Sequence, residues 1–463
     1  MPSGRAMRRV SEIERENPEG LRRLPHAGAG FEPDYFQFQW EADSRDGTEP
    51  LDKGLCGFDE GCESEMNNSR GERLLRTYSR RQLLKQSLGG TGLCIFGLHK
   101  LQSPNLRSDS DRFRGGTRIG TVPFSDEGSI PMGQPLGSEL DGRLFTDLSS
   151  LAPENPIIAT DEFYIRTRAS KLLDTNKSWS IQIGGLVETA STIPMQDLAK
   201  MARPMGIHLM ECAGNFRGAH FGMLSVADWE GVPIEEVLRF ANVQPSAARV
   251  LISGFDHYLA ESRSSIPGAS WIFTPEQLQS SRAFLATKMN GHPLTPDHGA
   301  PVRLLIPGWY GCACIKWVNE IHYVMEDAPA TTQMQEYAAR TMQNGMPSLA
   351  KDYAPAAIDF AAMPIRIERW SVEGKTKFRV VGIQWGGSRA IDGLEIQFNP
   401  QKDFQIVEDF RWSASDGWNF WTHTWSPEKP GRYLIRLRLK DPGMIARRLS
   451  SSYYLRSVEI NEI

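Results

Sequence analysis

Alternating apolar and polar residues predict strands along most of the chain from about residue 161 onward. The first group of predicted strands is DEFYIRTR (161–168), SWSIQIGGLV (178–187), GIHLMEC (206–212), ARVLISGF (248–255), PVRLLIPG (301–308) and KWVNEIHYVM (316–325). Helical spacing occurs between them in MQDLAKMA (195–202) and IEEVLRFA (234–241). Because strands and helices mix without a regular strand–helix–strand repeat, the pattern favours an α+β fold over a doubly wound sheet.

The region from Ile365 onward carries a purely β pattern. Its predicted strands are IRIERWSVE (365–373), KFRVVGIQW (377–385), IDGLEIQFN (391–399), WNFWTHTW (418–425) and GRYLIRLRLKD (431–441). Their spacing, with Gly, Asp and Pro turns, fits a β-sandwich. Residues 326–362 are rich in Ala, Pro, Gln and Met without strong patterning, and we interpret them as a linker. We therefore predict one domain at 155–325 and an all-β domain at 363–463.

The N-terminal part of the chain carries no comparable pattern. Residues 1–75 are crowded with charged residues, Gly and Pro, which predicts a disordered extension. Within 76–104, the stretch YSRRQLLKQSLGGTGLCIFGL resembles a twin-arginine export signal, because two arginines precede a short apolar run. A short amphipathic helix that carries two arginines by chance is the alternative. Residues 105–154 are polar and turn-rich, and we expect a loop region that leads into the first domain.

The export signal predicts a periplasmic protein. The signal begins far from Met1, so either translation starts later, with Met66 as a candidate, or the signal remains attached. No small-residue cleavage motif follows it, because the next residues are HKLQS. An uncleaved signal would retain the protein at the membrane. Twin-arginine export also hints at a cofactor, because it carries proteins that are already folded.

Composition narrows the classes of function. The chain has 463 residues, enough for two or three domains. Its formal net charge of −4 gives no basic footprint for nucleic acid, so we exclude that class of partner. The six cysteines form no CxxC or CxxCH motif, so we predict neither a zinc ribbon nor a c-type haem.

One cysteine stands out by its surroundings. Cys212 follows an apolar strand and precedes a turn, in HLMECAGNFRGAHFGMLSVADWEGVPI (208–234). From the residues alone it has three interpretations: a core thiol, a nucleophile or a metal ligand. A second block, MNGHPLTPDHGAPVRLLIPGWYGCACIKW (289–317), favours the interpretation of Cys212 as a metal ligand. The two blocks, in this order, resemble the sulfite oxidase family of molybdenum enzymes, which includes bacterial sulfite dehydrogenases and the molybdenum domain of plant nitrate reductase.

The resemblance implies a molybdopterin-binding domain followed by an immunoglobulin-like dimerisation domain, and hence a homodimer. It implies that Cys212 gives a thiolate to molybdenum, which is otherwise held by one molybdopterin per chain. The residues expected at the cofactor are Arg166, Cys212, Asp256, His298, Arg303 and Lys316. Among them, His298 and Arg303 would lie at the pterin phosphate, and Asp256 would accept hydrogen bonds from the pterin. Arg166 and Arg217, with Trp229 nearby, are the expected catalytic residues that hold a small oxyanion.

Some positions depart from the family pattern. Phe216 stands where the family has an arginine after Cys-Ala-Gly-Asn, and Arg168 stands where it has a histidine. Pro267 occupies the usual position of a tyrosine close to the metal, and proline cannot donate a phenolic hydrogen bond. Tyr258 and Tyr310 are the candidates to replace it. The departures weaken the expectation of sulfite as substrate more than that of the cofactor.

The sequence therefore predicts a molybdenum-dependent oxidoreductase that converts sulfite to sulfate. The chain has no haem motif, so we expect electrons to leave to an external acceptor such as cytochrome c. One alternative keeps the cofactor and reduces an S-oxide or another oxyanion. Another alternative is a non-catalytic protein in which a degenerate molybdopterin fold serves assembly.

Overall fold

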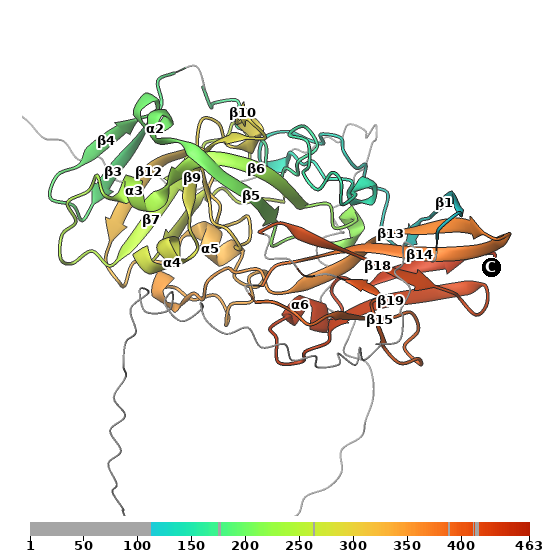
Figure 1. The fold of residues 1–463 in the computed structure, drawn as a ribbon. Coiled ribbons are helices and arrows are strands. Elements are labelled where there is room, and N and C mark those ends of the chain that lie inside the picture. Colours follow the sequence, from blue (N-terminus) through green and yellow to red (C-terminus); the bar gives the residue numbers. More distant parts are fainter. Residues whose placement is uncertain (1–112, 175–176, 263, 388, 411, 413–415) are drawn as a thin grey trace, which may run out of the picture. The chain divides into compact units, whose positions relative to one another are not determined.

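The computed structural model describes residues 113–174, 177–262, 264–387, 389–410, 412 and 416–463. The predicted disordered extension (1–75) and export segment (76–104) lie outside these residues. The described chain is mostly β-strand, arranged in four five-stranded sheets, and its helices are short (Figure 1). No helix among the described residues combines the length and the apolar composition that crossing a bilayer requires.

Two of the sheets belong to the first part of the chain. One contains β10 (His292–Pro293), β9 (Phe284–Met289), β6 (Leu224–Pro233) and β5 (Arg203–Glu211), with β11 (Arg303–Leu305) also paired to β9. The other contains β4 (Ser191–Pro194), β3 (Ser180–Gly185), β12 (Val318–Val324), β7 (Arg249–Gly254) and β8 (Ser270–Phe273). Only β12 and β3 pair in parallel, and the other pairs in these sheets are antiparallel. The prediction against a doubly wound sheet is confirmed.

Helices are a minor part of the described chain. They are α2 (Met195–Met201), α3 (Ile234–Leu238), α4 (Pro275–Ser280), α5 (Thr332–Glu336) and α6 (Arg447–Ser450). Single 3-10 turns occur at Glu139–Asp141, Leu148–Ser150, Arg217–Ala219, Pro296–His298 and Ala350–Asp352. The two helices predicted from periodicity are confirmed as α2 and α3. In contrast, α5 lies in the segment interpreted as an unpatterned linker.

The strand predicted at 161–168 is wrong. Ile165 forms only an isolated bridge, with Leu144, and the residues around it form turns and bends. The amide of Tyr164 donates to the hydroxyl of Ser225 at 3.1 Å instead of joining a ladder. Phe163, Tyr164 and Ile165 are nevertheless buried. Their apolar character thus reflects tertiary packing and not strand pairing.

The C-terminal part of the chain forms the other two sheets. One has the order β1 (Thr117–Val122), β13 (Ala361–Val372), β14 (Lys375–Trp385), β18 (Trp418–Trp425) and β17 (Asp409–Phe410). The other has the order β16 (Gln405–Ile406), β15 (Leu394–Gln397), β19 (Gly431–Leu439), β20 (Arg456–Ile460) and β2 (Phe124–Ser125). All five strands predicted here are present, and side chains of both sheets share one apolar cluster. The immunoglobulin-like assignment, the dimer and the domain boundaries remain predictions.

The loop region predicted at 105–154 contributes two of these strands. β1 pairs with β13, and β2 pairs with β20, so this segment completes both C-terminal sheets. Most residues of β1 are exposed. An exposed edge strand does not need the apolar alternation that sequence patterns detect, which explains why this segment was interpreted as loop.

The core of the first part continues into the C-terminal part. Trp385, Trp418 and Tyr454 belong to the same buried cluster as the strands around Cys212. Glu211, which is fully buried, accepts hydrogen bonds from Trp385 Nε1 at 2.9 Å and from the hydroxyl of Tyr454 at 2.8 Å. The C-terminal sheets are therefore packed directly behind the residue that precedes Cys212.

Candidate functional site

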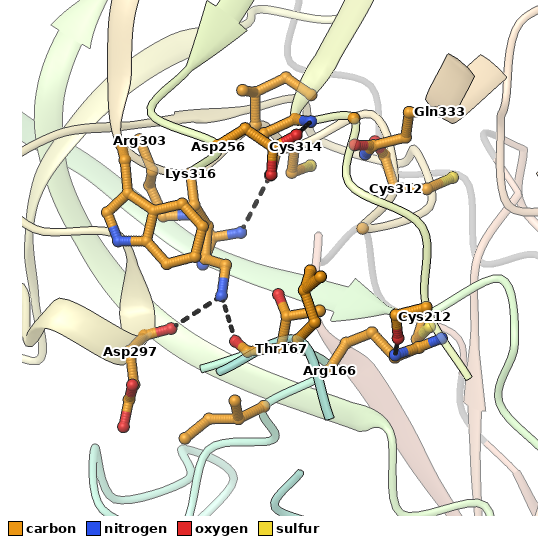
Figure 2. Close-up of a pocket in the computed structure, with 18 of the residues that line it drawn as sticks. Arg166, Thr167, Cys212, Asp256, Asp297, Arg303, Cys312, Cys314, Lys316 and Gln333 are labelled. Carbon is orange, nitrogen blue, oxygen red and sulfur yellow. Dashed lines mark hydrogen bonds between the residues drawn. The ribbon is translucent and has the colours of Figure 1, made fainter. Parts of the chain in front are cut away.

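One pocket collects side chains from several strand ends and from α5 (Figure 2). It contains about 860 Å³ of space, including the part open to solvent. Six of the residues predicted from the sequence line it: Arg166, Cys212, Asp256, His298, Arg303 and Lys316. These residues are far apart in the sequence, so the fold brings them together.

Cys212 lies directly after β5, in the turn that leads toward β6. Its amide donates to the carbonyl of Met223 at 3.0 Å, and Asn215 Oδ1 accepts from the amide of Met223 at 3.0 Å. These bonds tie both ends of the turn together. The amide of Gly214 donates to Cys212 Sγ at 3.3 Å. The sulfur is thus held in place at the pocket wall, and the side chain is 3% exposed.

Two cations face Cys212 across the pocket. Arg303 Nη1 donates to the carbonyl of His298 at 3.1 Å, and its Nη2 donates to the carbonyl of Cys314 at 3.2 Å. Lys316 Nζ donates to the carbonyls of Thr167 and Asp297. Burial lowers the pKa of both Arg303 and Lys316, and their mutual repulsion adds to the effect on Lys316. A buried cation that bonds only to carbonyls needs an anion nearby.

Asp256 and His298 complete this side of the pocket. Asp256 accepts a hydrogen bond from the amide of Ala269 at 3.2 Å, and burial raises the pKa of its carboxyl group. Burial lowers the pKa of His298 to about 4, so the ring is neutral at pH 7. His298 Nε2 lies 3.2 Å from the carbonyl of Phe163 and Nδ1 lies 2.7 Å from the hydroxyl of Thr295. Because a carbonyl only accepts, Nε2 carries the proton, and both ring nitrogens already have protein partners.

A cluster of guanidinium groups lies beside Cys212. Arg166 Nη1 donates to the hydroxyl of Ser265 at 2.8 Å. Arg143 Nη2 donates to the same hydroxyl at 3.0 Å and to the hydroxyl of Ser264 at 3.1 Å. Burial and the charge of Arg166 lower the pKa of Arg143 to about 10. Arg143 was missed from the sequence because it lies in the segment interpreted as a loop.

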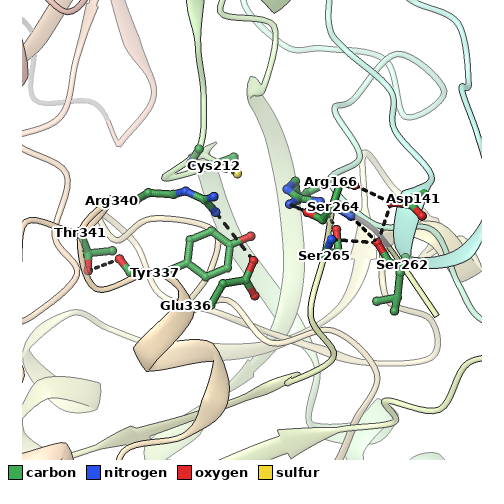
Figure 3. Close-up of polar contacts among 12 residues, drawn as sticks. Asp141, Arg166, Cys212, Ser262, Ser264, Ser265, Glu336, Tyr337, Arg340 and Thr341 are labelled. Atoms are coloured by element: carbon green, nitrogen blue, oxygen red, sulfur yellow. Dashed lines mark hydrogen bonds and ion pairs between the residues drawn. The ribbon is translucent and has the colours of Figure 1, made fainter. Parts of the chain in front are cut away.

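The opposite wall of this cluster comes from α5 and the residues after it. Gln333, Glu336 and Tyr337 line the pocket, and their spacing places them on one helical face. Figure 3 shows Tyr337 and Arg340 on one side of Cys212 and Arg166 on the other. Arg340 Nη1 lies 3.8 Å from the carboxylate of Glu336. None of these four residues is predicted at the site from the sequence.

Two predicted residues do not line the pocket. Arg217 begins a 3-10 turn and lies near Arg456, whose pKa is lowered by burial and, in smaller part, by the charge of Arg217. Trp229 is fully buried, and its Nε1 donates to the carbonyl of His208 at 3.3 Å. Its ring lies 5.8 Å from the guanidinium of Arg303. Arg217 and Trp229 thus lie outside the pocket lining, with Trp229 packed beside Arg303, and their role at a substrate remains a prediction.

The positions that depart from the family pattern differ in whether they line the pocket. Arg168 forms an ion pair with Asp297 at 2.8 Å and does not line the pocket. Ile266 and Gly268, which flank Pro267, line it, and a Cβ on Gly268 would lie 3.1 Å from the amide nitrogen of Gln333. The tyrosines that line the pocket among the described residues are Tyr164, Tyr258 and Tyr337. Tyr310, one of the two suggested replacements, does not.

Parts of the chain are similar to known proteins. Residues 169–332 match the model of the oxidoreductase molybdopterin binding domain. A nitrate reductase [NADPH] of Beauveria bassiana is 29% identical over 278 residues, which is 53% of this chain and 30% of that protein. Mitochondrial sulfite oxidase of Homo sapiens is 24% identical over 253 residues, which is 50% of this chain and 46% of that protein. The chain thus spans less than half of either relative.

A solved structure shares the fold. The sulfane dehydrogenase SoxCD from Paracoccus pantotrophus superposes with a TM-score of 0.53 at 17% identity, covering 82% of this chain and 99% of that one. Residues 169–332, which match the molybdopterin binding domain of oxidoreductases, supply most of the residues that line the pocket. The chain is also similar to mitochondrial sulfite oxidase and to nitrate reductases over part of their length, and it shares the fold of the sulfane dehydrogenase.

The residues at the pocket fit the cofactor that the family implies. Arg303 is buried and Lys316 is half-buried; both donate only to carbonyls among the described residues, and Arg303 Nε has no partner there. A phosphate would satisfy both. The described residues contain no group of three or more His, Cys, Asp or Glu side chains able to hold a metal. The protein would therefore hold molybdenum through Cys212, with the pterin supplying further ligands.

Proposed function

We propose that this pocket oxidises sulfite to sulfate and passes two electrons to an external acceptor. One observation carries the proposal: Arg166 lines the pocket together with Cys212, and Arg143, outside the lining, shares the hydroxyl of Ser265 with Arg166. Arg303 and Lys316 lie on the other side of the pocket (Figure 2). The pocket thus offers one cationic region for the cofactor and a second one for a small anion.

The charge of the second region suits an oxyanion. A small dianion leaves water only where converging cations replace its hydration. Arg166 is held by Ser265 Oγ and the carbonyl of Ser264, so its orientation does not depend on substrate. Arg143 donates to two backbone carbonyls, Leu140 and Gly142, as well as to serine hydroxyls. A site that is already oriented stabilises charge without rearrangement during the reaction.

The protein and the cofactor would divide the reaction between them. Sulfite and water give sulfate, two protons and two electrons. Molybdenum, when bound, supplies the oxygen-atom transfer and accepts the electron pair. The chain would hold the anion through Arg166 and Arg143, with sulfur directed toward Cys212. Glu336, whose carboxyl pKa is raised by burial, is a candidate to take up one of the released protons.

Reduction of another oxyanion is the second candidate. The similarity to nitrate reductases favours it, because the same guanidinium groups could hold nitrate. An S-oxide would need less positive charge than this cluster offers. The two functions differ in the direction of electron flow, so one purified sample can separate them.

The experiment begins with molybdenum content and then measures turnover. Protein made with an adequate cofactor supply should contain about one molybdenum per chain and should reduce ferricyanide when sulfite is added. Arg166→Gln should lose this turnover. Arg203→Gln, at an exposed pair with Glu236, serves as the matched control. Molybdenum without sulfite oxidation, but with oxidation of a reduced dye by nitrate, would replace the proposal by the reductase function.

We also propose export to the periplasm and electron transfer to a soluble cytochrome c. The support is Arg80 and Arg81 in the predicted signal, which lie outside the described residues. Replacing both by lysine should leave the folded protein in the cytoplasm of a bacterial host. Unchanged export of that variant would contradict the proposal.

A further inference from the structure

The start of α5 is fixed firmly against the pocket. Thr331 Oγ1 accepts from the amide of Met334 at 3.2 Å, which caps the helix, and donates to the carbonyl of Ser270 at 2.8 Å. The amide of the Gln333 side chain donates to the carbonyl of Cys312. These contacts anchor the helix to β8 and to the loop that carries Cys312. The side chain of Tyr337 is therefore presented to the pocket by a supported element.

The phenol of Tyr337 lies where the guanidinium cluster meets Cys212. The side chain is 7% exposed, and the guanidinium of Arg340 lies 5.2 Å from its ring centre. Burial raises the pKa of Tyr337, while the charge of Arg166 lowers it and that of Cys212 raises it. Both groups are thus close to the phenol. The net shift is upward, so the hydroxyl keeps its proton at neutral pH.

The Tyr337 hydroxyl can donate one hydrogen bond toward the pocket. Tyr337 lines the pocket, and the hydrogen bonds of Arg166 and Arg143 go to serines and carbonyls instead of to its hydroxyl. A phenolic hydroxyl on a pocket wall can donate a hydrogen bond to a group that the pocket binds. A donor that faces a cationic pocket fits an anionic oxygen as its partner.

We propose that Tyr337 is a catalytic residue that donates a hydrogen bond to an oxygen of the bound oxyanion. This inference rests on the proposed function, because it takes the anion to bind between Arg166 and Cys212. Arginines alone provide charge with little selectivity among anions. The neutral hydroxyl of Tyr337, held on a fixed helix, would restrict the orientation of the bound anion. Its hydrogen bond is strongest when the acceptor is an anionic oxygen.

The test compares Tyr337→Phe with the wild type as holoenzymes. Sulfate serves as a probe of the anion site, because its binding can be measured by equilibrium dialysis without turnover. Loss of one hydrogen bond to a charged group should weaken sulfate binding and raise the KM for sulfite roughly tenfold to a hundredfold. Molybdenum content and the thermal midpoint should change little, because the ring remains.

Tyr323→Phe is the matched control. Tyr323 lies on β12, away from the pocket lining, and its hydroxyl donates to the carbonyl of Leu238 at 3.2 Å. This variant loses a buried hydroxyl and should bind sulfate as the wild type does. Equal sulfate affinity in Tyr337→Phe and the wild type would overturn the inference, and so would a wild type that binds no sulfate.

The same data separate this inference from the proposed function. If the wild type binds sulfate but does not oxidise sulfite, the proposed function fails. The ratio of sulfate affinities between Tyr337→Phe and the wild type then still decides the role of Tyr337. If sulfite is oxidised and the ratio is one, the proposed function stands and the inference fails.

Discussion

Arg448 donates a hydrogen bond of 2.6 Å to the carbonyl oxygen of Ala213, the residue that follows Cys212. The same nitrogen donates to the carbonyl of Arg340 at 2.8 Å, and Nη1 lies 3.6 Å from the carboxylate of Glu211. Arg448 belongs to α6, close to the C-terminus. A C-terminal residue thus holds both the turn of Cys212 and the segment after α5, which are the two walls nearest the proposed anion site.

Replacing Arg448 by Met should therefore destabilise the protein strongly. The variant keeps the apolar stem but leaves Glu211 buried without its cation, which costs about 3–5 kcal/mol when such a pair is broken. We expect that loss in urea unfolding, and faster loss of molybdenum on dialysis because the turn of Cys212 loosens. Arg447→Met is the control, since Arg447 pairs with Asp359 and is 48% exposed. Its cost should stay below about 1 kcal/mol. Equal losses of unfolding free energy in the two variants would contradict the proposal that Arg448 holds the turn of Cys212 in place.

His298 should make the folded protein sensitive to acid. Its pKa is about 4 in the folded state, against an ordinary value of 6.5, because burial disfavours the charged ring. The unfolded chain therefore takes up a proton first as the pH falls, so stability present above about pH 6.5 is lost toward pH 4. The expected loss from this residue is about 3 kcal/mol.

Unfolding free energies of the wild type and His298→Gln across this pH range isolate the contribution. Glutamine can still donate to the carbonyl of Phe163 but does not titrate. Between pH 6.5 and pH 4 the unfolding free energy of the variant should fall by about 3 kcal/mol less than that of the wild type. Parallel curves would show that His298 is not buried as a neutral ring.

Residues near strand ends could be predicted from the sequence, and residues on irregular segments could not. Cys212, Arg303 and Lys316 lie in or beside predicted strands, within blocks that the family resemblance covers. Tyr337 follows a helix of five residues, too short for periodicity to be distinguished from chance. Arg143 lies in a polar segment whose position depends on contacts with Ser264 and Ser265.

Arg217 is predicted at the substrate from the family resemblance, and it lies in a single 3-10 turn after Phe216, outside the pocket lining. His220, which ends this turn, has a φ of 51°, a left-handed conformation that sequence patterns did not signal. The position of Arg217 thus depends on local backbone geometry that the sequence pattern does not show.

Lys316 should hold the cofactor at a cost to the cofactor-free protein. Lys316→Met removes a charge-assisted contact to the expected phosphate, so retention of molybdenum and pterin after dialysis should fall roughly tenfold or more. In cofactor-free protein the same change should leave stability unchanged or raise it, because burial disfavours the ammonium charge. Lys288→Met, at a half-exposed pair with Glu230, should change neither property. Undiminished pterin content in Lys316→Met would contradict this role.

Glu336 should weaken anion binding at neutral pH. Its carboxylate lines the pocket that contains Arg166, and burial raises its pKa above the ordinary 4.5. Protonation on acidification removes a negative charge, so the Kd for sulfate should fall as the pH is lowered. Glu336→Gln reproduces the uncharged form and should bind sulfate roughly threefold to tenfold more tightly at pH 7. The difference from the wild type should vanish in acid, because sulfate keeps its charge there. Weaker binding by the variant at every pH would instead mean that Glu336 acts by positioning Arg340.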